Sequence, residues 1–294
     1  MGSYEKNIRF TKMHGAGNDY IYIDALSEVP ENLPLLSRQI SNRHYGVGSD
    51  GLVAIMHSET CDFRMRMFNS DGSEAQMCGN ASRCIGKYVY ERGLTSKTEI
   101  SLETLSGVKT LRLTVDGGKV VNVKVDMGVP DLAPDNVPVR KADKSPMIAE
   151  EVRVGCHIYK VTAVNVGNPH GVVFSNEIDD DMVRHDGPLL EAADIWPEKA
   201  NIEFAVVESR DRIRMRVWER GSGETLACGT GACAAVVAAV ANGLTGRRVT
   251  VELPGGGLDV EWNEADGHVW LSGGAEFIAD GVFYPGVALA RDEV

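Results

Sequence analysis

Short stretches in which apolar and polar residues alternate recur along the chain and predict β-strands. The pattern is clearest at residues 63–68, Phe-Arg-Met-Arg-Met-Phe, and at residues 213–218, Ile-Arg-Met-Arg-Val-Trp. We predict further strands at residues 98–104, 110–115, 120–126, 159–166, 202–207, 249–253, 258–262 and 269–273. So many short strands indicate a protein dominated by a largely antiparallel sheet.

Two stretches predict helices, and a glycine follows each of them. Residues 79–91 precede Gly93, and residues 230–241 precede Gly243, which is the usual place of glycine after a helix. Residues 232–241 have no polar side chain, so this helix must be buried on every side, and ten residues are too few to span a membrane. We therefore predict an α+β fold in which each half of the chain has a mostly antiparallel sheet or barrel wrapped around a central helix.

The chain also repeats itself at an interval of 150 residues. Residues 64–95 and 214–245 align without a gap, and nine of 32 positions are identical, where chance would give about two. The same interval pairs Gly17-Asn18 with Gly167-Asn168. We interpret the repeat as two similar domains, residues 1–128 and 129–275, related by a pseudo-twofold axis. Such an axis sets equivalent residues facing each other at a domain interface, where ligand clefts often form.

Composition excludes several classes of protein. The 294 residues carry a net charge of −12 and no basic stripe, which argues against a nucleic-acid partner. No apolar run is long enough for a membrane helix, and residues 1–6 lead on without an apolar signal region. Six cysteines are too sparse for a disulfide framework, so we expect free thiols in a soluble, cytoplasmic protein.

Two cysteines occupy equivalent positions in the repeat, each just before a predicted helix. They stand in Gln76-Met77-Cys78-Gly79-Asn80 and in Leu226-Ala227-Cys228-Gly229-Thr230. The unpaired N–H groups and positive dipole of a helix start can bind a carboxylate, and they lower a thiol pKa from about 8.5 toward neutrality. The two glycines allow a ligand close to the backbone, and Asn80 and Thr230 have side chains typical of helix N-caps.

This duplication predicts a specific chemistry. Two such sequences facing each other would hold a carboxylate between helix starts and set one sulfur on each face of its α-carbon. One thiolate would remove the α-proton, and the other thiol would return a proton from the opposite side, which inverts the centre. The helix starts would stabilise the charge that spreads into the carboxylate. Cys78 and Cys228 are thus the predicted catalytic pair.

Two other readings of the cysteines are weaker. Cys78 with Cys84, and Cys228 with Cys233, could be metal-ligand pairs, but spacings of six and five point the two side chains about 120 to 140° apart around a helix. A Cys–His hydrolase using His170 would leave the second thiol without a purpose. We therefore expect no metal site, and we expect Cys61 and Cys156 to serve only in packing.

Several longer motifs give the chain a marked resemblance to the diaminopimelate epimerase family. They run from Phe10 to Tyr20, from Asn42 to Gly51, from Phe68 to Asn80, from Gly167 to His170 and from Glu219 to Gly231. The resemblance implies interconversion of LL- and meso-2,6-diaminopimelate without pyridoxal phosphate, in lysine and peptidoglycan synthesis. It also implies that residues 277–289 return as a strand to the first domain, which we take as residues 276–294, and it suggests a homodimer.

The resemblance further implies roles for individual side chains. Asn69, Asn168, Asn201 and Arg220 would hold the distal carboxylate and amino group of the substrate, and Asn18 would line its reactive end. His170 and Glu219 would flank the reacting amine and the thiols. The chain departs from the family pattern at Gly51, where some members have Gln, and at Gly171, where Cys is frequent.

The first testable prediction concerns the cofactor. No lysine lies in a motif suited to a pyridoxal Schiff base, and two thiols at helix starts make an electron sink less necessary. We expect the purified protein to be colourless and its activity to withstand EDTA and hydroxylamine. An absorbance band typical of an internal aldimine, or loss of activity on chelation, would contradict this prediction.

Overall fold

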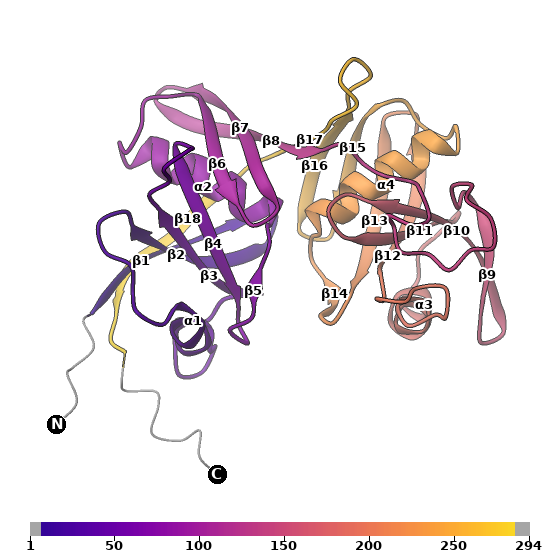
Figure 1. Cartoon of the computed structure of the whole chain (residues 1–294), viewed down its shortest axis with the longest axis horizontal. Helices are drawn as coiled ribbons and strands as arrows, with labels where there is room; N and C mark the ends of the chain where they lie inside the picture. The colour runs from indigo at the N-terminus through magenta and orange to yellow at the C-terminus, as the bar shows by residue number, and fades with distance from the viewer. Residues whose placement is uncertain (1–6, 286–294) are drawn as a thin grey trace, which may run out of the picture. The chain divides into compact units, whose positions relative to one another are not determined.

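The computed structural model describes residues 7–285, and these form two compact units. Unit 1 contains the residues up to Val125 together with those from Gly274 onward, and unit 2 is Asp126–Gly273. Figure 1 shows both units, each with many strands and few helices. Residues 1–6 and the end of the predicted C-terminal strand, residues 286–294, lie outside the described residues.

Unit 1 is built on one continuous set of paired strands. Its elements are β1 (Ile8–Gly15), β2 (Asn18–Ala25), α1 (Leu33–Ser41), β3 (Gly51–Met56), β4 (Phe63–Asn69), β5 (Glu74–Ala75), α2 (Gly79–Glu91), β6 (Glu99–Thr104), β7 (Gly107–Asp116), β8 (Lys119–Gly128) and β18 (Glu276–Phe283). β18 pairs antiparallel with β1, as the resemblance implies for this stretch. β2 and β3 are parallel, as are β4 and β6, and the remaining pairs are antiparallel.

Unit 2 repeats the scheme with its own elements. These are β9 (Glu150–Val154), β10 (His157–Asn165), β11 (Pro169–Phe174), η1 (Met182–Asp186), α3 (Gly187–Glu191), β12 (Asn201–Ser209), β13 (Arg212–Glu219), β14 (Gly223–Thr225), α4 (Gly229–Ala241), β15 (Arg248–Leu253), β16 (Gly256–Trp262) and β17 (Val269–Gly273). β11 and β12 are parallel, as are β13 and β15, and the other pairs are antiparallel.

The two units therefore have the same strand pairing, and even the register agrees. Tyr20 lies opposite Gly51 in unit 1, and His170 lies opposite Asn201 in unit 2, both at the 150-residue interval of the sequence repeat. The predicted α+β class, with a mostly antiparallel sheet and few helices in each half, is confirmed. All eight further predicted strands are present, and both predicted helices form, at Gly79–Glu91 and Gly229–Ala241.

The central helix of unit 2 is buried on all sides, as its composition requires. Every residue from Gly231 to Ala239 is buried, and α4 contacts seven strands of its unit. Within residues 7–285 no helix is both long and apolar enough to cross a membrane. Helix α2 differs from α4 in that it contains polar residues. One of them, the buried Lys87, donates from Nζ to the Val120 carbonyl at 2.9 Å.

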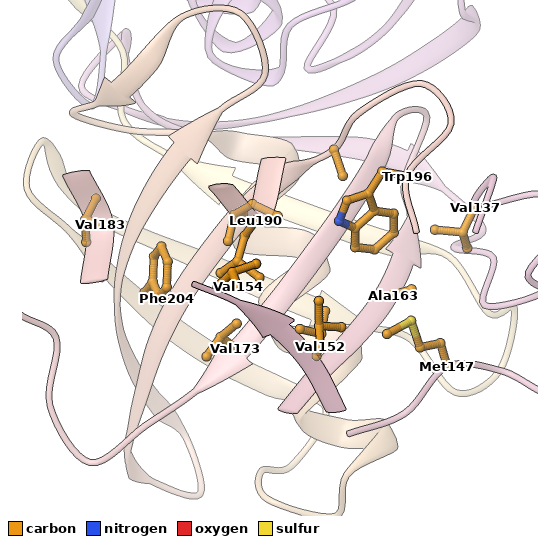
Figure 2. Close-up of a cluster of buried hydrophobic side chains, with 13 residues drawn as sticks. Val137, Met147, Val152, Val154, Ala163, Val173, Val183, Leu190, Trp196 and Phe204 are labelled. Carbon is orange, nitrogen blue, oxygen red and sulfur yellow. The ribbon is translucent and has the colours of Figure 1, made fainter. Parts of the chain in front are cut away.

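A second layer covers the opposite face of each sheet. In unit 1, α1 packs Leu36 and Ile40 against Leu52 and Phe68. Figure 2 shows the corresponding cluster of unit 2, in which side chains from β9 to β12 meet Val183 of η1 and Leu190 of α3. Because neighbouring residues of a strand point to opposite faces, each central strand has one side toward this layer and one toward the central helix.

The predicted packing role of Cys156 is wrong. This residue is exposed, in the tight turn between β9 and β10, where the strand pairing leaves its side chain outside the sheet. Cys61 is half-buried in the bend before β4.

The packing of α4 gives a second prediction. Ala235 is fully buried among small side chains, so Ala235→Leu should lower the free energy of unfolding by about 1 to 3 kcal/mol through overpacking. The matched control Ala265→Leu places the same side chain at an exposed turn residue, and it should change the free energy by less than about 0.5 kcal/mol. Urea titration of both variants measures the difference, and equal stabilities would mean that α4 is not enclosed as described.

Candidate active site

Cys78 ends the turn after β5 and is the N-cap residue of α2. Its backbone is extended, with φ −140° and ψ 125°, so Gly79 is the first helical residue and Asn80 the second. Asn80 is therefore inside the helix and is not the cap that its residue type suggests. Its amide group donates to Asn18 Oδ1 at 3.4 Å.

The Cys78 thiol also faces Asn18, which lies at the start of β2. Its Sγ donates to Asn18 Oδ1 at 3.7 Å, while Asn18 Nδ2 donates to Asp50 Oδ2 at 2.8 Å. Asp50 in turn pairs with Arg43 at 3.0 Å. Because a carboxylate can only accept, it binds the amide nitrogen of Asn18 and leaves the amide oxygen facing the thiol. Burial raises the pKa of Asp50, and the nearby Asp19 adds to that rise.

Cys228 occupies the equivalent place in unit 2, as the N-cap residue of α4. Here the sulfur itself caps the helix, because it accepts from the Gly231 N–H at 3.4 Å. Its Sγ also lies 3.4 Å from Thr230 Oγ1. As with Asn80, Thr230 is the second helical residue and not the cap. The side chain of Cys228 is buried, with 5% of the residue exposed.

The lowered thiol pKa predicted from the helix start is wrong for Cys228. Burial raises the pKa of this thiol well above its usual value, and the carboxylates of Glu219 and Glu203 raise it further. The contacts with Thr230 and Gly231 oppose the rise without cancelling it. Burial and two acidic neighbours therefore outweigh the contacts at the helix start that favour the thiolate.

Glu219 is held close to that thiol at the end of β13. Its Oε1 accepts a short hydrogen bond from Thr225. Burial raises the pKa of Glu219, while hydrogen bonds with Thr225 and Cys228 lower it. The predicted placement of Glu219 beside a thiol thus agrees with the geometry of unit 2.

His170 and Asn168 lie on the same edge of unit 2. The ring of His170 is fully buried, with Nδ1 at 2.7 Å from Glu203 Oε1 and Nε2 at 3.0 Å from Asn168 Oδ1. Both ring nitrogens are therefore engaged within the protein. This arrangement leaves His170 without the free ring nitrogen that a Cys–His hydrolase would need for its base.

The residues assigned to the distal end of the substrate fall at strand ends. Asn201 begins β12, and its Oδ1 accepts from the Arg220 N–H at 2.8 Å, while Arg220 Nη1 donates to the Glu198 carbonyl at 2.9 Å. In unit 1, Asn69 ends β4, and its amide group donates to Ser73 Oγ at 3.0 Å. Asn201 and Arg220 are thus held together in unit 2, and Asn69 lies in unit 1.

Both departures from the family pattern have a steric reason. A Cβ atom on Gly51 would lie 2.1 Å from the Phe68 carbonyl oxygen and 2.9 Å from Tyr20 Cε1. A Cβ atom on Gly171 would lie 2.7 Å from Trp196 Cζ2. This backbone therefore admits no side chain at Gly51, and it admits one at Gly171 only if Trp196 moves.

The other helix cysteines do not belong to these sites. Cys84 and Cys233 are completely buried in the helix bodies, and burial raises the pKa of Cys84 to about 11. In the part of the chain that the structure describes, no group of three His, Cys, Asp or Glu side chains could hold a metal ion.

Sequence analysis missed two of the residues that shape these sites, Asp50 and Glu203. Asp50 lies inside the motif from Asn42 to Gly51, but nothing local in the sequence indicates that its carboxylate orients Asn18. For Glu203 a signal exists, because the repeat pairs it with Val53, an apolar core position. The sequence could therefore have indicated Glu203, because it is a charged residue whose counterpart in the repeat is apolar.

Comparisons with known proteins indicate the family of the chain. The family model described as diaminopimelate epimerase matches residues 10–133 and 162–278. A diaminopimelate epimerase of Methanococcus maripaludis is 51% identical, covering 93% of this chain and 99% of its own. One from Acetivibrio thermocellus is 53% identical, covering 93% of this chain and 98% of its own.

Solved structures with lower identity share the fold. A hydroxyproline epimerase from Agrobacterium vitis, solved with trans-4-hydroxy-L-proline, has a TM-score of 0.70 at 14% identity, covering 96% of this chain and 92% of its own. A phenazine biosynthesis protein of the PhzF family from Bacillus anthracis has a TM-score of 0.67 at 16% identity, covering 94% and 99% of the two chains. On the evidence of the family model and these close relatives, the chain belongs to the diaminopimelate epimerase family.

Proposed function

We propose that this protein interconverts LL- and meso-2,6-diaminopimelate, with Cys78 and Cys228 as the acid–base pair. The observation that supports this most directly is the identical local construction around the two thiols. Each is the N-cap residue of the central helix of its unit, each is followed by glycine at the first helical position, and the two are 150 residues apart in a chain whose units share one strand pairing. A single-base enzyme has no use for two such thiols.

The reaction needs only proton movement between carbon and sulfur. The thiolate of one cysteine takes the α-proton of the substrate, leaving the electron pair on the carbon, and the thiol of the other delivers its proton to the opposite face. The charge spreads into the substrate carboxylate, which the backbone N–H groups of Gly79, Asn80, Gly229 and Thr230 would stabilise. In the reverse direction the two cysteines exchange roles.

Recognition of the rest of the substrate would come from amides and one guanidinium. Asn69, Asn168, Asn201 and Arg220 would hold the distal carboxylate and amino group, and Asn18 would contact the reactive end. Supporting this, Asn201 accepts from the Arg220 backbone N–H, and Asp50 fixes the amide of Asn18. Sites built from hydrogen-bonding groups reject analogues that lack the partner strongly.

Two further assignments accompany this proposal. All six cysteines are free, which agrees with a reducing compartment such as the cytoplasm. A homodimer remains an expectation from the family resemblance, and sedimentation of the purified protein would test it.

Substrate identity is tested by solvent exchange. The protein is incubated in D2O with LL-diaminopimelate and, separately, with L-proline, and the α-deuterium and stereoisomer content are measured. Deuterium and the meso isomer should appear only with diaminopimelate. Exchange on proline alone would move the assignment to the proline racemase relatives of the same fold.

The two-base mechanism gives a third prediction. Cys78→Ala and Cys228→Ala should each reduce turnover to no more than a few per cent of wild type, because a site with one thiol cannot both take and return a proton across the carbon. Cys156→Ala is the control, since this cysteine is exposed and lies in the turn between β9 and β10. Substantial turnover in either of the first two variants would refute the mechanism.

A fourth prediction tests whether both sulfurs can reach one carbon atom. Air oxidation without substrate should join Cys78 to Cys228 in a disulfide, inactivate the protein reversibly and be blocked by diaminopimelate. Because the raised pKa of Cys228 leaves little of its thiolate, oxidation should be slow at neutral pH. Non-reducing peptide mapping identifies the linkage. Oxidative inactivation with linkage only through other cysteines would contradict the proposed pair.

A further inference from the structure

Glu203 is a charged residue in a position that belongs to the core. It lies on β12 between Ile202 and Phe204, which both face the layer of η1 and α3, so its own side chain points toward the central helix α4. The residue is completely buried, and its counterpart in unit 1 is the equally buried Val53. Burial of a carboxylate costs free energy unless specific contacts compensate for it, which indicates that Glu203 has a function in the protein.

The carboxylate of Glu203 and the sulfur of Cys228 both lie next to Gly231. A Cβ atom on Gly231, in the first turn of α4, would be 2.7 Å from Glu203 Oε1 and 3.3 Å from Cys228 Sγ. The oxygen and the sulfur therefore flank the same glycine.

Glu203 also determines how His170 is held. Its Oε1 lies 2.7 Å from His170 Nδ1, so the hydrogen bond between the two side chains fixes the orientation of the ring. The second ring nitrogen lies 3.0 Å from Asn168 Oδ1. Loss of Glu203 would free one side of the ring and, through it, the Asn168 amide.

Unit 1 has no corresponding arrangement around Cys78. At the 150-residue interval, Tyr20 corresponds to His170, Val53 to Glu203 and Asn69 to Glu219. Each of these three ionisable groups of unit 2 therefore has a neutral or apolar counterpart in unit 1. The two catalytic helices are equivalent in backbone and different in charge. The acidic groups that raise the pKa of Cys228, Glu219 from β13 and Glu203 from β12, belong to unit 2, where His170 from β11 lies beside Glu203.

We propose that Glu203 is a positioning residue that locks the His170 ring and, by its charge, keeps Cys228 protonated until substrate binds. The protein then begins each turnover with Cys228 as the proton donor, and the substrate isomer that needs this donor binds the resting form directly. The opposite isomer requires the proton to be on Cys78 first. This inference rests on the proposed function for its catalytic meaning, but the state of the thiol can be measured without turnover.

The test measures alkylation of each cysteine as a function of pH in the substrate-free full-length protein. A small neutral reagent, iodoacetamide, is applied, and the rate for the peptide containing Cys228 is followed by mass spectrometry. The pH at which the rate reaches half its plateau reports the thiol pKa and does not depend on access. In wild type this midpoint should lie above about 8.5, the ordinary thiol value.

Glu203→Gln keeps the size and one acceptor oxygen of the side chain and removes the charge. At a pH below the midpoint, Cys228 alkylation should become at least about tenfold faster, because a unit charge close to the sulfur is lost. The control Glu191→Gln makes the same change at another buried glutamate of unit 2, which bonds Trp218 Nε1 at 2.8 Å and does not face the thiol. Its midpoint for Cys228 should equal that of wild type.

Either of two results would overturn the assignment. One is an unchanged Cys228 midpoint in Glu203→Gln relative to Glu191→Gln. The other, decisive even if Glu203→Gln fails to fold, is a wild-type midpoint at or below the ordinary thiol value. Failure of the proposed function is separate: the midpoint would shift as expected while Cys228→Ala retained turnover.

Discussion

The structure depends on a buried helix whose first capping residue is a cysteine. In each unit the strands surround the helix, so its axis and its starting point are fixed by the core and not by the surface. The N-cap position then sets each cysteine at the start of its helix, where the sulfur of Cys228 accepts from the Gly231 N–H, and glycine follows at the first helical position in both units. A mobile loop could not hold a thiol in this relation to a helix dipole. The same packing that stabilises each unit thus determines where its reactive group lies.

Duplication has preserved this framework while the polar groups around it have diverged. Strand pairing and register agree between the units, including Tyr20 opposite Gly51 and His170 opposite Asn201. In unit 1 the thiol faces an amide that Asp50 orients, whereas in unit 2 the thiol faces carboxylates and itself caps the helix. The two thiols therefore have different polar surroundings, although their helices begin in the same way.

Much of this could be predicted from the sequence, for reasons that are local or repetitive. Alternation gave the strand at Phe63–Asn69, glycine at Gly243 gave the end of α4, and the repeat identified Cys78 and Cys228 as equivalent. What could not be predicted depends on contacts between distant residues. The pKa of Cys228 follows from burial and from carboxylates on two other strands, and the effect of Asp50 on Asn18 follows from strand pairing.

Helix α4 also has a consequence for how the chain reaches and leaves its native state. Because it has no polar face, it gains almost nothing from forming before the strands of unit 2 close around it. Any opening of that sheet exposes ten consecutive residues without a charge, a segment of the kind that chaperones bind and that aggregates when left uncovered. Cys233 belongs to this segment, so a partly unfolded chain exposes a thiol that is completely buried in the native protein. Opening of the sheet around α4 therefore exposes the chain to aggregation and to oxidation of Cys233 at the same time.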